Sequence, residues 1–226
     1  MIQATELRFE AGSSAGEVSG LLMQPDHAHA MLVFAHGAGA GMQHPFMAAA
    51  SGALAERGVA TLRYQFPYME NGPRRPDPQP LLLATVRSAV GVARRHAPGL
   101  PLFAGGKSMG GRMTSLADAS APLEELQGIA FIGFPLHPPK RPGTERAEHL
   151  AHTTKPLLFV QGTRDTLAGL ELLRPVVDRL GDRARMHVID GADHGFAVLR
   201  RTGRTADDVI GEIADVIATW CRETRP

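Results

Sequence analysis

The stretch Gly105-Gly106-Lys107-Ser108-Met109-Gly110-Gly111, directly behind the apolar run Leu102-Phe103-Ala104, decides between two kinds of protein. As Gly-Lys-Ser it ends a nucleotide-binding loop, in which the lysine reaches toward phosphates. As Gly-x-Ser-x-Gly it is a nucleophile elbow, in which Ser108 attacks a substrate from a sharp turn between a strand and a helix. The surrounding residues favour the second interpretation.

The phosphate-binding pattern requires a glycine five positions before Gly106, and that position holds Pro101. Proline has no amide hydrogen to donate to a phosphate, and its φ is fixed. A nucleotide site would also need an acidic magnesium ligand at the end of a later apolar strand. The apolar run 128–132 ends instead in Gly133-Phe134-Pro135. The sequence therefore argues against nucleotide binding.

Composition indicates a soluble globular enzyme. A chain of 226 residues, 43% hydrophobic and 21% charged, is expected to form one domain over 1–226. The net charge of +1 gives no electrostatic reason to expect nucleic acid or a membrane as partner. The only cysteine, Cys221, excludes an internal disulfide and a thiolate metal cage. The histidines lack metal-ligand spacing, so neither a metal nor another cofactor is expected.

Targeting signals are not evident. The first residues, MIQATELRFE, lack the basic segment and apolar core of a signal peptide. No apolar run approaches the roughly 20 residues of a membrane span. We therefore expect a cytoplasmic protein.

Short apolar runs alternate with segments of helical period. The predicted strands are Glu17–Met23, Met31–Ala35, Ala60–Tyr64, Leu102–Gly105, Gly128–Ile132, Leu157–Gln161 and Met186–Ile189. The predicted helices are Pro45–Arg57, Pro80–His96, Met109–Ala119, Leu167–Leu180 and Thr205–Arg222. Apolar strands separated by helices favour a doubly wound, mostly parallel α/β sheet covered on both faces. The strands before the first helix are expected to form an antiparallel edge.

Ligands of such sheets bind outside the carboxyl ends of the strands, so the residues after each strand are the candidates. Ser108 has small residues two positions before and after it, Gly106 and Gly110, as a strained elbow requires. The helix predicted to begin at Met109 favours negative charge beside the serine. Ser108 is the candidate nucleophile, although a serine here can also be a plain helix N-cap.

A serine nucleophile needs a base and an orienting carboxylate. Asp165 and His194 follow the last two predicted strands, in the chain order Ser108, Asp165, His194. Asp190 and Asp193 compete for the acid: Asp190 ends a strand, and Asp193 adjoins the histidine. Other histidines are placed elsewhere, at the early loop, a helix start, one long loop and a strand: His36, His44, His137, His149, His152 and His187.

An oxyanion needs preorganised amide donors. One is expected from Met109, next to the nucleophile, and one from the loop His36-Gly37-Ala38-Gly39-Ala40-Gly41, with Ala38 preferred and Gly39 second. The dinucleotide fingerprint fails in this loop, because Met42 stands where its last glycine belongs.

With these motifs the chain resembles the α/β-hydrolases, in particular the small, dienelactone hydrolase-like bacterial serine hydrolases. The resemblance covers about Glu17 to Cys221 and rests on four motifs: His36–Gly39, Phe66–Glu70, Gly106–Arg112 and Gly162–Asp165. It implies a single α/β-hydrolase domain, a mostly parallel twisted sheet flanked by helices, with a minimal lid. Dienelactone hydrolases use a cysteine nucleophile, however, and the serine here favours ordinary ester hydrolysis.

The sequence thus predicts a serine esterase that acts on a small-molecule ester. A thioesterase or small peptidase would use the same machinery, and an interaction module with an idle hydrolase fold is the alternative of another class. Candidate substrate-binding residues are Lys107, Tyr68, Leu136, His137 and Phe196. Lys107 would attract an anionic substrate or pair with a carboxylate. The proline-rich tract Pro67–Pro76, with its pair Arg74-Arg75, should border the cleft or form a solvated surface loop.

The connection Phe134–Leu150 holds four prolines and is too short for a separate lid domain. It predicts a shallow, pre-formed, solvent-facing site with Leu136, His137 and Phe196 in its apolar wall. Such a site favours short acyl esters.

Overall fold

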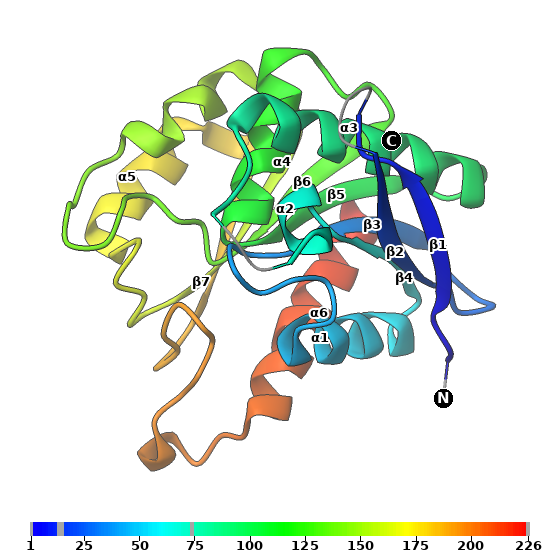
Figure 1. Ribbon diagram of the computed structural model, residues 1–226. Helices are drawn as coiled ribbons and strands as arrows, with labels where there is room; N and C mark the ends of the chain where they lie inside the picture. The colour runs from blue at the N-terminus through cyan, green and yellow to red at the C-terminus, as the bar shows by residue number, and fades with distance from the viewer. Residues whose placement is uncertain (1, 13–15, 73–74, 225–226) are drawn as a thin grey trace.

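Figure 1 shows the computed structural model, which describes residues 2–12, 16–72 and 75–224. The strands of the described residues form one sheet in the order β1-β2-β4-β3-β5-β6-β7-β8. Their bounds are β1 Thr5–Glu10, β2 Glu17–Met23, β3 Ala30–Ala35, β4 Val59–Tyr64, β5 Leu102–Lys107, β6 Leu126–Ile132, β7 Leu157–Gly162 and β8 Ala184–Ile189. From β4 to β8 in this order, every neighbouring pair is parallel.

Helices cover both faces of this sheet (Figure 1). Their bounds are α1 Pro45–Glu56, α2 Pro67–Glu70, α3 Gln79–His96, α4 Met109–Ser120, α5 Leu170–Arg179 and α6 Ala206–Glu223, with short 3-10 helices at Glu145–His152, Gly181–Arg183 and Arg200–Thr202. One core layer holds the apolar sides of α3, α4 and α5, and the other holds those of α1 and α6. The strands between them are buried on both sides, which is why β3 reads as a continuous apolar run.

The predicted α/β architecture is confirmed, with two differences at the antiparallel edge. That edge consists of β1 and β2, whereas β3, expected within it, lies between β4 and β5 and is parallel to both. Six fully buried residues in β3 are incompatible with an edge position. β1 was not predicted, because its charged residues alternate with Leu7 and Phe9 and leave no apolar run.

A third difference concerns α5, which begins at Leu170 and not at Leu167. The Asp165 carboxylate accepts a hydrogen bond from the Leu167 amide at 2.8 Å and holds the intervening residues in a turn. This turn keeps the Asp165 side chain at the carboxyl edge of the sheet. The segments after β3, β5, β7 and β8 meet at that edge.

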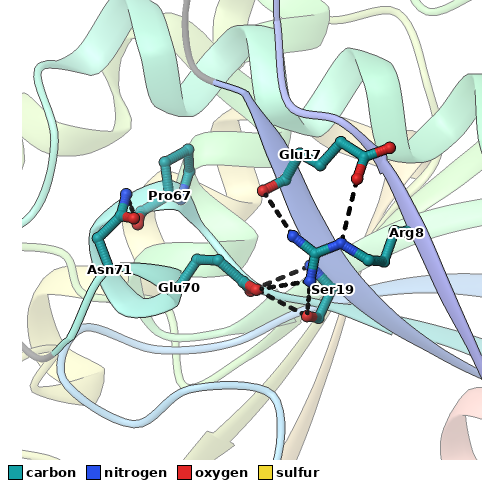
Figure 2. Close-up of polar contacts among 6 residues, drawn as sticks. All are labelled: Arg8, Glu17, Ser19, Pro67, Glu70 and Asn71. Atoms are coloured by element: carbon teal, nitrogen blue, oxygen red, sulfur yellow. Dashed lines mark hydrogen bonds and ion pairs between the residues drawn. The ribbon is translucent and has the colours of Figure 1, made fainter.

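The short helix α2, which follows β4, is attached to the antiparallel edge through Glu70 (Figure 2). The Glu70 carboxylate accepts hydrogen bonds from the Ser19 amide at 3.0 Å and the Ser19 hydroxyl at 2.8 Å. It also forms an ion pair with Arg8 at 3.2 Å. Although burial favours the neutral form, the hydrogen bonds from Ser19 and Arg8 hold the pKa of Glu70 below its usual value. The edge strands thereby position α2 beside the sheet.

Replacing Glu70 by alanine is expected to lower the free energy of unfolding by about 1–3 kcal/mol, because the Ser19 amide loses a charged acceptor. Urea denaturation measures this loss. Glu17→Ala is the matched control: Glu17 also pairs with Arg8, but its side chain is 52% exposed against 19% for Glu70. An exposed ion pair contributes little, so the control should lose much less. Equal losses would show that the Glu70 contacts do not anchor α2.

Candidate functional site

Ser108 stands at the turn between β5 and α4 in a strained conformation. Its φ is +50° and its ψ is −117°, a region that non-glycine residues rarely occupy. A Cβ on Gly106 would lie 2.2 Å from the Ala35 carbonyl oxygen, and one on Gly110 would lie 2.5 Å from the same atom. Glycine is therefore required on both sides of the serine, which is the elbow geometry that the sequence predicted.

A line of hydrogen bonds runs from Ser108 through His194 to Asp165. The Ser108 Oγ lies 2.9 Å from His194 Nε2, and His194 Nδ1 lies 2.7 Å from Asp165 Oδ2. Because the carboxylate can only accept, the imidazole Nδ1–H donates to Asp165, and Nε2 is left to accept a hydrogen bond from the Ser108 hydroxyl. The three side chains come from the ends of β5, β8 and β7.

The Asp165 carboxylate is almost fully buried, with 4% of the residue exposed. Besides the histidine, it accepts hydrogen bonds from the Leu167 amide at 2.8 Å and from Gln161 Nε2 at 2.5 Å. Gln161 in turn accepts from the Phe134 amide at 3.0 Å, which fixes its orientation. Gln161 was missed from the sequence, although a glutamine within the apolar run of β7 was a signal of a buried polar role.

The two competing carboxylates lie elsewhere. Asp190 Oδ1 accepts from the Thr163 hydroxyl at 3.3 Å. Asp193 Oδ1 accepts from the amides of Gly195 and Ala197 at 2.8 and 3.0 Å and so shapes the turn that carries the histidine. Neither hydrogen bonds to the His194 ring among the described contacts.

The loop 36–44, between β3 and α1, begins with a fully buried histidine. His36 Nε2 accepts from the Phe66 amide at 3.1 Å, and its Nδ1 lies 2.8 Å from the Gly37 carbonyl oxygen. Burial lowers the pKa of His36 to about 4, although the bond to Gly37 opposes that shift. A neutral imidazole with Nδ1–H satisfies both contacts, so His36 supports this loop from beneath.

Three further side chains hold the loop 36–44 in place. The Tyr68 hydroxyl accepts from the Gly39 amide at 3.2 Å, and Gln65 Oε1 accepts from the Met42 amide at 2.8 Å. Arg63, on β4, donates to the Met42 carbonyl at 3.1 Å. The sequence assigned Tyr68 to substrate binding, and the structure places it against the loop instead. Gln65 and Arg63 were not anticipated.

Two amide groups beside Ser108 remain available. The Gly39 amide is engaged by Tyr68, and the Ala40 amide donates to the Gly37 carbonyl at 3.2 Å. Met109 is the first residue of α4, so its amide has no acceptor within the helix. Among the described residues, the amides of Ala38 and Met109 have no hydrogen-bond acceptor. They are the two donors that the sequence proposed.

Ser108 lies between two cavities that also share Ala38 and Leu167. The first, which we call the histidine-side cavity, has a volume of about 370 Å³ and is lined further by His44, Phe46, Met47, Lys107 and His194. The second, the arginine-side cavity, has a volume of about 620 Å³ and is lined further by Arg75, Asp77, Met109, Arg112 and Arg146. Ser108 therefore borders space for two different substituents.

Lys107 contacts the main chain of His194 and not a carboxylate. Its Nζ donates to the His194 carbonyl at 2.6 Å and lies 5.4 Å from the centre of the Phe196 ring. Burial lowers the pKa of Lys107 to about 8, against the opposing influence of the Asp165 and Asp193 carboxylates. The lysine lines the histidine-side cavity and anchors the segment that carries the histidine.

The structure places the predicted apolar wall differently. Leu136 is fully buried in the core and His137 is 4% exposed, and neither lines the two cavities. Phe196 is also buried and stacks on Phe46, which is the residue that reaches the cavity. Leu136 packs among the core residues instead, so position after a strand did not predict exposure. Of the pair Arg74-Arg75, Arg74 lies outside the described residues.

With this geometry in view, comparison with known proteins is decisive about the family. A family model of the alpha/beta hydrolase domain matches residues 28–222. The chain belongs to the α/β-hydrolase family. This match spans the strands β3 to β8 and every segment of the site.

Solved structures resemble this α/β-hydrolase over almost its whole length. A dienelactone hydrolase from Anabaena variabilis is 21% identical, with a TM-score of 0.75 and 98% of each chain covered. An α/β serine hydrolase without lid from Xanthomonas campestris is 18% identical, with a TM-score of 0.74 and coverage of 96% of this chain and 95% of that one. The esterase domain of a Rhodothermus marinus protein is 19% identical, with a TM-score of 0.73 and coverage of 98% and 99%. At such identities the likeness establishes the fold alone.

Within the described residues, no group of three or more His, Cys, Asp or Glu side chains is arranged to hold a metal ion. In the same part of the chain, no helix is both long and apolar enough to cross a membrane.

The buried His36 makes the stability of this α/β-hydrolase dependent on pH. Its pKa lies below the usual 6.5, so between pH 6.5 and about 4 this residue binds more protons in the unfolded chain than in the folded one. The free energy of unfolding should therefore fall as the pH is lowered through this window, by up to about 1.4 kcal/mol per pH unit for this group. His36→Gln, which keeps an acceptor for the Phe66 amide, should flatten this dependence in denaturation measured at several pH values. His27→Gln, at an exposed histidine, should keep the wild-type slope; an unchanged slope in His36→Gln would contradict a neutral His36.

Proposed function

We propose that this α/β-hydrolase is a serine hydrolase of carboxylic esters. The observation that carries the proposal is the continuous hydrogen-bonded line Ser108–His194–Asp165, with the serine open to two cavities and flanked by two unengaged amides. A histidine that accepts from a serine and donates to a buried carboxylate has the geometry of a general base.

In the proposed mechanism, His194 Nε2 takes the proton of Ser108 as Oγ attacks the ester carbonyl carbon. The carbonyl oxygen becomes an oxyanion, and the amides of Met109 and Ala38 donate to it. Asp165 keeps the imidazole in the required tautomer and stabilises the imidazolium. Since Tyr68, Gln65, Arg63 and His36 already hold the 36–44 loop, its donor does not need to be reordered during the reaction.

The tetrahedral intermediate then expels the alcohol. The imidazolium returns its proton to the leaving oxygen, and the acyl group stays on Ser108 as an ester. Water enters, loses a proton to the same His194 nitrogen and attacks the acyl carbon. Collapse of this second intermediate releases the carboxylic acid and restores the serine.

The test of this proposal is hydrolysis of 4-nitrophenyl acetate by matched variants. Asp165→Asn should lower kcat by a factor on the order of 10⁴, because an asparagine favours the wrong tautomer of His194. Asp190→Asn is the control with the same chemical change on a nearby loop, and it should lower kcat by less than about threefold. Ser108→Ala should reduce turnover to the background of the imidazole alone. A larger loss in Asp190→Asn than in Asp165→Asn would reject the assigned acid, and turnover unchanged in Ser108→Ala would reject the nucleophile.

The second expectation concerns acyl length. The connection between β6 and β7 carries the 3-10 helix Glu145–His152 and no longer helix, so the site lacks a helical cover that would open at an oil surface. We expect kcat/KM on nitrophenyl esters to be highest at short acyl chains and to fall toward palmitate. Rates measured below and above the solubility limit of the longer esters should show no jump. A maximum at long chains, or a jump when an emulsion forms, would contradict an open site.

A further inference from the structure

The two cavities beside Ser108 differ in charge. The residues that line the arginine-side cavity include three arginines, Arg75, Arg112 and Arg146, and one acidic residue, Asp77. The Asp77 carboxylate is engaged in another hydrogen bond, because its Oδ2 accepts from the Tyr68 amide at 2.9 Å. This cavity therefore carries an excess of positive charge in direct continuity with the serine hydroxyl.

Arg112 is one of the cations that line this cavity. It lies on α4, one helical turn after Ser108, and is only partly exposed. Its Nε donates to the Arg146 carbonyl at 3.4 Å, and among the described residues it forms no ion pair with a carboxylate. Burial, reinforced by the nearby Arg146 guanidinium, lowers the pKa of Arg112 below its usual value.

The surroundings of Arg112 do not compensate its charge. The side chain of His149, which bonds Ser115 at 2.8 Å, has its pKa lowered to about 4 by burial and by Arg112, so the imidazole is neutral and does not offset the charge of Arg112. Arg146 is a second cation and likewise forms no ion pair among the described residues. Holding two guanidinium groups together, partly desolvated, costs free energy that an anion between them would offset.

The geometry of the proposed reaction assigns this cavity to one half of the substrate. The leaving oxygen must lie near His194 Nε2 to receive its proton, and His194 lines only the histidine-side cavity. The alcohol therefore occupies that cavity, beside the apolar side chains of Phe46 and Met47. The acyl chain must then extend into the arginine-side cavity.

We propose that the arginine-side cavity is an anion subsite, in which Arg112 and Arg146 bind a carboxylate at the far end of the acyl chain. The preferred substrates are then monoesters of dicarboxylic acids with a small alcohol. Planar, bidentate donors such as guanidinium groups suit a carboxylate well. This inference rests on the proposed ester hydrolysis, because that reaction determines which half of the substrate enters the cavity.

The test compares monomethyl esters of straight-chain dicarboxylic acids, from succinate to suberate, with methyl esters of the monocarboxylic acids of equal length. Release of acid is followed by pH-stat, and the readout is the ratio of kcat/KM for the charged and neutral members of each pair. At the best chain length we expect a ratio of about tenfold or more, as a charge-assisted hydrogen bond implies. High salt should reduce the ratio, because it screens the attraction.

Arg112→Gln and Arg146→Gln should each lower this ratio by about tenfold or more. The matched control is Arg95→Gln, which removes an exposed arginine on α3 that lines a different surface depression. It should leave the ratio within about twofold, since it changes the net charge but not the subsite. If the neutral esters are hydrolysed and the ratio stays near one, the subsite is overturned while the proposed ester hydrolysis stands.

A binding measurement separates the subsite from the reaction. Adipate, a dicarboxylate, should raise the Tm of the wild-type protein, and hexanoate at the same concentration and ionic strength should raise it less. The adipate effect should be lost in Arg112→Gln. If no ester is hydrolysed, this pattern still supports the subsite and rejects only the proposed reaction. An equal response to adipate in the wild type and in Arg112→Gln overturns the subsite.

Discussion

The close approach of β5, β3 and the first turn of α4 is the constraint on which the site depends. Gly106 and Gly110 both face the Ala35 carbonyl at distances that exclude any Cβ. This contact forces the chain to reverse direction within one residue, and Ser108 takes a conformation that costs about 1–3 kcal/mol. The strain directs the serine hydroxyl out of the sheet and leaves the Met109 amide free at the start of the helix. Both features of the proposed reaction therefore have one cause.

The loop 36–44 is held in place for a different reason: three side chains from elsewhere in the sequence, and one of its own, form hydrogen bonds that fix it. Tyr68 and Gln65 follow β4, Arg63 lies within it, and the neutral His36 connects the loop to the Phe66 amide. Helix α2, which carries Tyr68, is itself attached to the outer strands through Glu70 (Figure 2). The antiparallel edge thus influences the site indirectly, because it positions Tyr68. The Tyr68 hydroxyl accepts from the Gly39 amide, and the Ala38 amide is left as the available donor.

The proposed anion subsite follows from a difference in charge between the two cavities that meet at Ser108. On one side of the Ser108 hydroxyl, Phe46 and Met47 accompany His194, and on the other side Arg112 and Arg146 face open space. The arginine-side cavity carries more positive charge than the histidine-side cavity, whose one lysine, Lys107, donates to the His194 carbonyl. An ester with a terminal carboxylate would therefore bind preferentially in one direction. The bound ester would then already place its leaving oxygen near His194, so less orientational entropy would be lost in reaching the transition state.

The sequence by itself determined the α/β class, the elbow at Ser108 and the residues Asp165 and His194 at the ends of their strands. It could do so because those features depend on local patterns: apolar runs, required glycines, and polar residues that directly follow a strand. Only the tertiary structure decided which contacts those residues make. It moved β3 from the expected edge to the centre of the sheet, buried Leu136 and His137, and turned Tyr68 toward the loop 36–44. It also brought Gln161 to Asp165 and placed Arg112 beside Arg146, two residues that are far apart in the sequence. These pairings depend on how separate segments pack, because the direction of a side chain is set by the neighbours it meets and not by its position after a strand.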